Sequence, residues 1–250
     1  MLARRRPVGV LLKSTDVVTE GDLAVLCPPP LRLHVARLAL NPGESFEAML
    51  PRLDSACAQI KDARPEIIVF ACASATFAGA DALDRRVAER IEAATGRPVI
   101  TAAAALIDAA RRMEMHRILL VSPYIDEIDL GIRRMFDGVG IQVASVLGLR
   151  PREIFQPAFL AKFGGTGNRL IDPAWLPELV ADAIATASGV DGVVIACTGL
   201  RASEALATLE QDTGLPVVAA NQAIAAATQR GLGLRVPVAG FGALLERPPQ

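Results

Sequence analysis

The chain has 250 residues, which at roughly 100–200 residues per domain is enough for one large or two small domains with a real core. Its 26 Lys and Arg residues nearly balance 27 Asp and Glu residues, giving a net charge of −1, and aromatic residues make up 4%. These numbers exclude the basic, aromatic-rich surface that nucleic-acid binding uses.

The first expected element is a strand at residues 7–12. This apolar run follows a charged start, but it is too short for a signal peptide and is interrupted by Lys13. Further apolar, β-branched runs predict strands at residues 33–40, 66–72, 97–101, 117–122, 142–149, 191–197 and 216–221. Helical spacing of apolar residues predicts helices at residues 45–63, 80–94, 127–139, 175–187 and 202–212. This alternation with nearly all-apolar strands predicts an α/β fold in which helices cover both faces of parallel sheets. No apolar run approaches the roughly 18 residues of a membrane span, so we expect a cytoplasmic protein without membrane or nucleic-acid partners.

Two stretches of the chain resemble each other. TGRPVITAAAALIDAARR at residues 95–112 aligns without a gap on TGLPVVAANQAIAAATQR at residues 213–230, and each follows a strand that ends at a cysteine. Such self-similarity indicates an internal duplication of an αβ unit. We therefore expect two similar Rossmann-like (flavodoxin-like) domains with parallel sheets, related by a pseudo-twofold axis.

The two cysteine segments are IVFACASATF, which holds Cys72, and VVIACTGL, which holds Cys197. Open α/β sheets bind ligands beyond the carboxyl ends of their strands, so the two thiols are expected to flank one active-site cleft between the domains. A helix that starts at each cysteine would lower the thiol pKa and offer N–H groups to a carboxylate. The hydroxyls of Ser74, Thr76 and Thr198 add hydrogen bonds near these thiols.

Two thiols on opposite faces of one carbon can move a proton between the faces, or one can attack as a nucleophile while the other transfers protons. Neither route needs a metal or an organic cofactor, and we expect none. The competing interpretation is that both are buried core cysteines. The other two thiols lack this setting, because Cys27 precedes three prolines and Cys57 lies inside an amphipathic pattern, so both are excluded from the site.

The sequence resembles the aspartate/glutamate racemase superfamily, and within it the branch of maleate cis-trans isomerases and arylmalonate decarboxylases. The resemblance covers nearly the whole chain, and its most specific parts are the two cysteine segments, SPYIDEIDLGIRRMFDGVGIQV, LHVARLAL and ACTGLRASEALATLEQDTGLPVVAANQA. It implies a cofactor-independent enzyme that holds a small carboxylate or dicarboxylate, and a homodimer or higher homo-oligomer. It also implies that the chain's end joins the first domain, giving residues 1–113 plus 228–250 as one domain and residues 114–227 as the other.

Carried over by position, the resemblance makes Cys72 the nucleophile and Cys197 the acid/base partner, and it makes Tyr124 a hydrogen-bond donor to a substrate carboxylate. Thr198 and Gly199, beside the second thiol, are further expected substrate contacts. Ser74 has the matching place near the first thiol.

Three departures from the branch bear on the substrate. Asp16 stands where the branch has an Asn that binds a carboxylate, and Ala73 stands where it has a Thr. The segment 150–173 is longer than the branch leads us to expect, holds Phe155, Phe159 and Phe163, and offers Asn168 as the stand-in for a second substrate Asn. A carboxylate at residue 16 repels a substrate carboxylate unless one is protonated or Lys13 compensates.

Maleate isomerase-like cis-trans isomerisation is therefore the leading hypothesis. The alternatives are an arylmalonate-type decarboxylase, an amino-acid racemase, a non-enzymatic small-carboxylate binding protein and a redox-sensing thiol pair. Cys72 counts against the decarboxylase, because that group has Gly at the first cysteine position.

Overall fold

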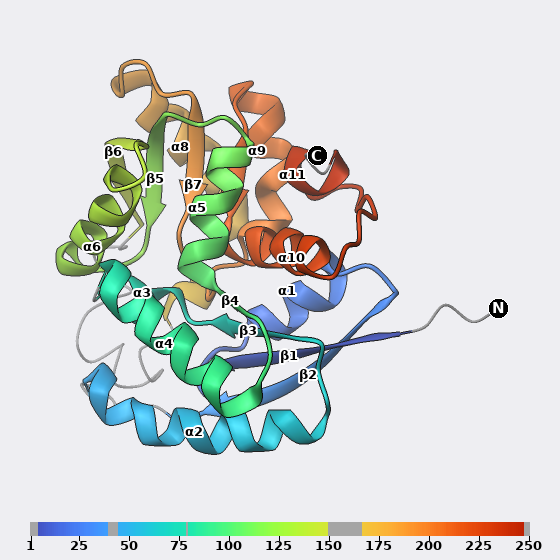
Figure 1. Cartoon of the computed structure of the whole chain (residues 1–250). Coiled ribbons are helices and arrows are strands. Elements are labelled where there is room, and N and C mark those ends of the chain that lie inside the picture. Colours follow the sequence, from blue (N-terminus) through green and yellow to red (C-terminus); the bar gives the residue numbers. More distant parts are fainter. Residues whose placement is uncertain (1–4, 40–44, 79, 150–166, 248–250) are drawn as a thin grey trace.

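The computed structural model describes residues 5–39, 45–78, 80–149 and 167–247, and it contains two four-stranded sheets (Figure 1). The first sheet has the order β2-β1-β3-β4, with β1 (Arg6–Lys13), β2 (Leu31–Leu38), β3 (Ile67–Ala71) and β4 (Val99–Thr101). The second has the order β6-β5-β7-β8, with β5 (Arg117–Ser122), β6 (Gln142–Gly148), β7 (Gly192–Ile195) and β8 (Val217–Ala219). All pairings are parallel, which confirms the predicted α/β fold with two similar halves.

The central strands show why these sequences form parallel sheets. Val10 of β1 pairs with Val35 on one side and Val69 on the other. β-Branched and other apolar side chains fill both faces of such a strand, so helices must cover both faces.

The helices complete the alternation that the sequence predicts. Their bounds are α1 (Thr19–Leu26), α2 (Phe46–Asp62), α3 (Ala73–Ala78), α4 (Ala80–Thr95), α5 (Ala102–Arg112), α6 (Asp126–Asp137), α8 (Leu176–Thr186), α9 (Leu206–Thr213), α10 (Ala220–Gly231) and α11 (Ala243–Glu246). Short 3₁₀ helices are η1 (Gly167–Leu170), η2 (Pro173–Trp175) and η3 (Ala202–Ala205). Among the described residues, no helix combines the length and apolar character needed to cross a bilayer.

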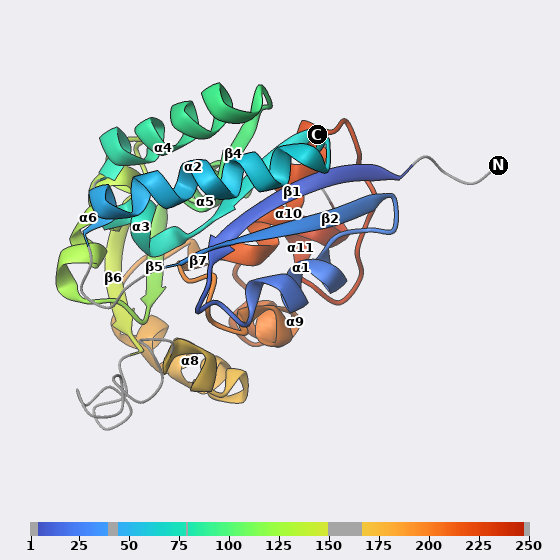
Figure 2. The ribbon, with the colours of Figure 1, turned by 90° about the horizontal axis from the view of Figure 1, so that it is seen from below.

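Successive residues of each central strand point alternately into a central core layer and into an outer one. Val10 of β1 and Leu120 of β5 belong to one central cluster that also takes in α5 and α10. Their neighbours point outward, where Leu11 packs with α2 and α4, and Leu119 packs with α8 and α9. Figure 2 shows α2 and α4 side by side over the first sheet. The two halves therefore share a central core layer, and each has an outer core layer of its own.

The duplicated stretches occupy equivalent places. One forms β4 and α5, the other forms β8 and α10, and the two helices pack against each other at the junction of the halves (Figure 1). The N-termini of these two helices differ. The Thr101 hydroxyl accepts a hydrogen bond from Ala104 N at 3.1 Å and so caps α5. At the equivalent position, Ala219 instead donates its backbone N–H to Gln222 Oε1 at 3.1 Å.

Two local features differ from the sequence-based expectation. The short helix α1 lies between the first two strands, where none was expected, because its buried face includes the polar Thr19 and Asp22 and so shows no apolar periodicity. After Cys197 the chain makes a turn instead of entering a helix at once, and α9 starts only at Leu206 after η3.

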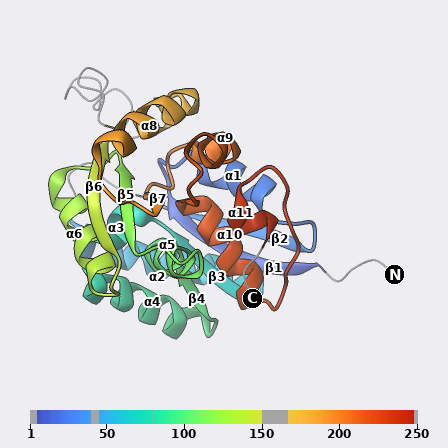
Figure 3. The same cartoon turned by 90° about the horizontal axis from the view of Figure 1, so that it is seen from above.

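The end of the chain contacts both parts of the molecule. α11 lies beside α10 (Figure 3), and Gln222 Nε2 donates to the carbonyl of Phe241 at 2.6 Å. Arg6, at the start of β1, donates to the carbonyl of Leu232 at 3.2 Å. The expected domain boundaries stay a prediction.

Candidate active site

A cavity of about 390 Å³, part of it open to solvent, lies at the carboxyl ends of strands from both sheets. Its described lining consists of residues 13 and 15–18 after β1, Tyr124 after β5, residues 168 and 169 in η1, and residues 197–199 after β7. The remainder of the 150–173 segment up to residue 166, with Phe155, Phe159 and Phe163, lies outside the described residues.

Cys197 is a buried thiol surrounded by donors. Asn168 Nδ2 donates a hydrogen bond to its sulfur at 3.3 Å, and the Tyr124 hydroxyl and the Gly199 backbone N–H also hydrogen-bond the sulfur. Asn168 and Gly199 thus contact the thiol itself. Thr198 is buried beside it and lines the cavity.

The protonation of Cys197 differs from the expected lowered pKa. Burial raises the pKa of this thiol, and the donor bond from Tyr124, the charge of Lys13, and the bonds from Gly199 and Asn168 offset only part of that effect. The donors that favour the thiolate are present, but the effect of burial outweighs them and favours the protonated thiol. A protonated Cys197 is suited to donate a proton.

Tyr124 lines the cavity just after the end of β5 and packs against both the central cluster and the outer cluster of the second half. Its backbone N–H donates to Ser122 Oγ at 3.1 Å, and that hydroxyl donates to Asp129 Oδ1 at 2.5 Å, which fixes the turn after β5. Burial, followed by the nearby Cys197, Cys72 and Asp16, raises the Tyr124 pKa well above its ordinary value. A neutral phenol within electrostatic reach of both thiols can donate to a ligand held between them.

Cys72 lies between β3 and α3 and is fully buried in the outer core layer of the first half. Unlike Cys197, it is not among the described residues that line the cavity, although its charge acts on Tyr124, which does line it. Ser74 accepts a hydrogen bond from Lys13 Nζ at 3.1 Å. The Thr76 hydroxyl donates to the Ala73 carbonyl at 3.1 Å and is therefore occupied inside α3.

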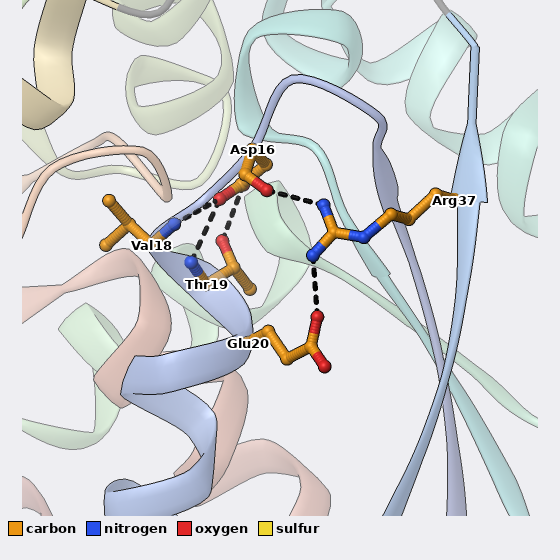
Figure 4. Close-up of polar contacts among 5 residues, drawn as sticks. All are labelled: Asp16, Val18, Thr19, Glu20 and Arg37. Carbon is orange, nitrogen blue, oxygen red and sulfur yellow. Dashed lines mark hydrogen bonds and ion pairs between the residues drawn. The ribbon is translucent and has the colours of Figure 1, made fainter.

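Asp16 lines the cavity but is engaged by its own turn (Figure 4). Its Oδ1 accepts from the backbone N–H groups of Val18 and Thr19 at 2.9 Å, and its Oδ2 accepts from Thr19 Oγ1 at 2.6 Å. Arg37 donates to its carbonyl at 2.6 Å. The carboxylate satisfies the first N–H groups of α1, which gives this departure from the branch a local structural role.

Sequence reasoning missed a network behind the Cys197 turn. The carbonyl of Thr198 accepts from Asn221 Nδ2 at 2.9 Å, and the same amide donates to Asp22 Oδ2 at 2.8 Å. Thr19 Oγ1 approaches the Thr198 carbonyl at 3.1 Å. Burial raises the pKa of Asp22 to about 6, while hydrogen bonds from Asn221 and Ser203 lower it in part. The only sequence signal was the position of Asn221 at the end of a predicted strand.

Lys13 and Arg169 also line the cavity, although neither was assigned to the site from the sequence. Lys13 was detectable, because it ends β1 at the same sheet edge that brings the thiols to the cleft. Across the described residues, no group of three or more His, Cys, Asp and Glu side chains has the arrangement of a metal site. Cys57 is buried in α2 and Cys27 follows α1, both away from the cavity lining.

Comparison with known proteins identifies relatives over the whole chain. The family model for arylmalonate decarboxylase matches residues 24–245. A maleate isomerase of Pseudomonas putida is 29% identical over 253 residues, which cover 95% of this chain and 96% of that protein. The crystal structure of the maleate isomerase Iso from Pseudomonas putida S16 matches with a TM-score of 0.82 and 25% identity, over 97% of this chain and 98% of that one. A cysteine-to-serine mutant of Nocardia farcinica maleate cis-trans isomerase, solved with a covalently bound succinylcysteine intermediate, has a TM-score of 0.82 at 24% identity and covers 97% of this chain and 98% of its own.

Proposed function

The chain belongs to the arylmalonate decarboxylase family, and from that premise we propose that it is a cofactor-independent isomerase that interconverts the cis and trans forms of a small unsaturated dicarboxylic acid of the maleate type. The observation that carries the proposal is the pair of thiols, Cys72 and Cys197, placed after equivalent strands of two similar sheets. An isomerisation that adds and removes a nucleophile needs such a pair and leaves no net proton or electron behind.

In the forward direction, the Cys72 thiolate adds to one carbon of the double bond. The electron pair of that bond moves to the neighbouring carbon and into its carboxylate, and the Cys197 S–H protonates this carbon. The product is a succinyl thioether with a C–C single bond, the same kind of adduct as the covalently bound succinylcysteine of the Nocardia farcinica enzyme. The raised pKa of Cys197 suits it to this donor step.

Rotation about the new single bond then brings the two carboxylates to opposite sides. The Cys197 thiolate takes a proton back from the same carbon, the double bond re-forms, and the C–S bond to Cys72 breaks. Both thiols return to their starting states. The donors around Cys197 that partly offset the effect of burial stabilise its thiolate between the two proton transfers.

The remaining cavity residues are proposed substrate contacts. Tyr124 and Asn168 offer a hydroxyl and an amide beside Cys197, and Thr198 and Gly199 form the turn that carries it. Ser74 holds the corresponding place after Cys72. For Asp16 we propose an indirect role, because its carboxylate oxygens serve the start of α1.

The test is proton NMR in D₂O with maleate, aspartate, glutamate, hydroxy acids and arylmalonates. We expect maleate to convert to its trans isomer. Because the Cys197 thiol exchanges with solvent, deuterium enters the vinyl position in those turnovers in which the thiolate removes the original hydrogen and leaves the added deuteron. Cys72→Ser and Cys197→Ser should each lower turnover by about 10³-fold or more, the usual scale for loss of a covalent catalytic group.

The Cys27→Ser variant is the matched control, because this thiol lies outside the cavity lining and its loss should leave turnover unchanged. Circular dichroism checks that each variant is folded. Full activity in either site variant would eliminate the two-thiol mechanism. Release of CO₂ from an arylmalonate without isomerisation of maleate would favour the decarboxylase alternative.

We also propose a cytoplasmic protein that forms a homodimer or a higher homo-oligomer, since most soluble oligomers are closed symmetric assemblies of one chain. Sedimentation at several protein concentrations measures the assembly state.

A further inference from the structure

Lys13 is a cation in the lining of the cavity. It ends β1, where the preceding residues Leu11 and Leu12 are fully buried, and its side chain is half-buried at the cavity lining. The hydrogen bond described for its ammonium goes to a neutral hydroxyl, Ser74 Oγ, at 3.1 Å. An ammonium has three N–H donors, so this bond leaves capacity for an anionic ligand.

The position of Lys13 relates it to both thiols. Ser74 follows Cys72 by two residues, so the hydrogen bond ties the ammonium to the turn that carries the first thiol. On the other side, the charge of Lys13 reaches Cys197 and lowers its pKa against the effect of burial. A cation related to both thiols in this way can reach a carboxylate next to the reacting carbons of a bound substrate.

The described hydrogen bonds of the nearby Asp16 carboxylate go to its own turn and not to Lys13. Three hydrogen bonds from Val18 and Thr19 hold its carboxylate oxygens toward the start of α1. A carboxylate that already receives such bonds has less negative potential left for a neighbouring ammonium.

We infer that Lys13 binds the substrate carboxylate adjoining the carbon that Cys197 protonates, and so restricts the site to acids that carry a carboxylate at that carbon. This inference rests on the proposed function and names the group that recognises its substrate. During addition of the Cys72 sulfur, negative charge moves into this carboxylate, so the attraction to the ammonium strengthens in the transition state. Lys13 therefore contributes to kcat as well as to substrate binding.

The test compares Lys13→Met, which keeps the length and removes the charge, with Lys13→Arg, which keeps the charge. Lys61→Met is the matched control, because Lys61 is exposed and donates to the Ala94 carbonyl at 3.2 Å at the far end of α2. The readouts are kcat and KM for maleate, and the inhibition constant of succinate, the saturated analogue that cannot isomerise. Lys13→Gln replaces Lys13→Met if the latter does not fold.

We expect Lys13→Met to lower kcat/KM by roughly 10²–10³-fold, with part of the loss in kcat, the scale seen when a donor to a developing oxyanion is removed. Succinate should bind at least about tenfold more weakly to this variant, which corresponds to about 1.4 kcal/mol. Lys13→Arg should recover most of the binding, and Lys61→Met should match the wild type.

Direct calorimetry of succinate binding separates this inference from the proposed function. If the wild type isomerises maleate but Lys13→Met has unchanged kcat/KM and succinate affinity, the proposed function stands and the role of Lys13 is wrong. If the wild type turns over no acid but succinate binding is lost in Lys13→Met alone, the proposed function fails while the carboxylate site stands. Equal succinate binding by both proteins, or none by the wild type, overturns the inference.

Discussion

The Asp16 carboxylate caps the start of α1. Thr19 Oγ1 lies 2.6 Å from Asp16 Oδ2 and 3.1 Å from the Thr198 carbonyl, but a hydroxyl has only one proton to donate. The hydroxyl donates its proton to the shorter contact, which is to a charged oxygen. Thr19 therefore hydrogen-bonds Asp16 and leaves the carbonyl of Thr198, in the Cys197 turn, without a hydrogen bond from this hydroxyl. An Asn at this place would donate to the hydroxyl and release its proton toward Thr198.

We therefore expect Asp16→Asn to cost little stability, because its amide oxygen still accepts from the N–H groups of Val18 and Thr19. Asp16→Ala removes the cap and should lower the free energy of unfolding by about 1 kcal/mol, within the usual range of about 0.5–2 kcal/mol. Urea denaturation of the three proteins measures both effects. Equal losses in the Asn and Ala variants would show that charge, not the hydrogen-bond acceptor, stabilises the start of α1.

The positions of the two thiols at strand ends were predictable because the pattern occurs twice, whereas the contacts of single residues were not. Cys72 and Cys197 were detectable because each ends an apolar strand run. They follow β3 and β7, which are parallel strands at the same place in the strand order of their sheets. Asn221 contacts Asp22, which is 199 residues away, and no local pattern reports such a contact. The raised pKa of Cys197 was equally hidden, because it depends on burial by distant segments.

At the scale of elements, the turn after β7 is held between α1 and α10 by a buried network. Asn221 of α10 donates to both the Thr198 carbonyl and Asp22 of α1. Folding raises the pKa of Asp22 from 3.8 to about 6, chiefly by desolvation. The ionised form of this carboxyl thus opposes folding. The stability that the protonated form allows is fully present below pH 3.8 and is lost as the pH rises through about 6.

Asp22→Asn keeps an oxygen for Asn221 and removes the titration. Relative to this variant, the wild type should lose up to about 3 kcal/mol of unfolding free energy between about pH 4 and about pH 7.5, at roughly 1.4 kcal/mol per pKa unit. Urea denaturation at both pH values measures the change, with the exposed Asp62→Asn as the matched control. A difference between wild type and variant that is the same at both pH values would contradict the raised pKa.

The element order was largely predictable for a physical reason. Strands buried on both faces need continuous apolar runs. β5 has the predicted bounds of residues 117–122, and the other strands differ from their predicted bounds by at most two residues at either end. The helix α1 was missed because its buried face includes Thr19 and Asp22, whose burial depends on partners in the second half of the chain. Polar residues that serve the site thus obscured the pattern that reveals a helix.

At the scale of the whole molecule, the shared central layer joins the halves. Val10 of β1, Val69 of β3, Leu120 of β5 and Val194 of β7 belong to one cluster with the packed pair α5 and α10. The surface link between these helices, from Arg230 to Asp108 at 2.6 Å, is partly exposed and contributes little by comparison. Loss of the second sheet would expose the inner face of the first, so the halves should unfold together.

Val194→Ala tests this coupling, because its side chain is fully buried in the second half at the central layer. We expect a loss of about 1–3 kcal/mol from the removed contacts and the cavity left behind. In hydrogen exchange followed by mass spectrometry, the slowest amides of β3 in the first half should lose as much protection as those of β5 beside β7, since they exchange only through global opening. Protection lost in the second sheet alone would instead mean that each half unfolds by itself, and that the cleft holding both thiols could open without loss of either fold.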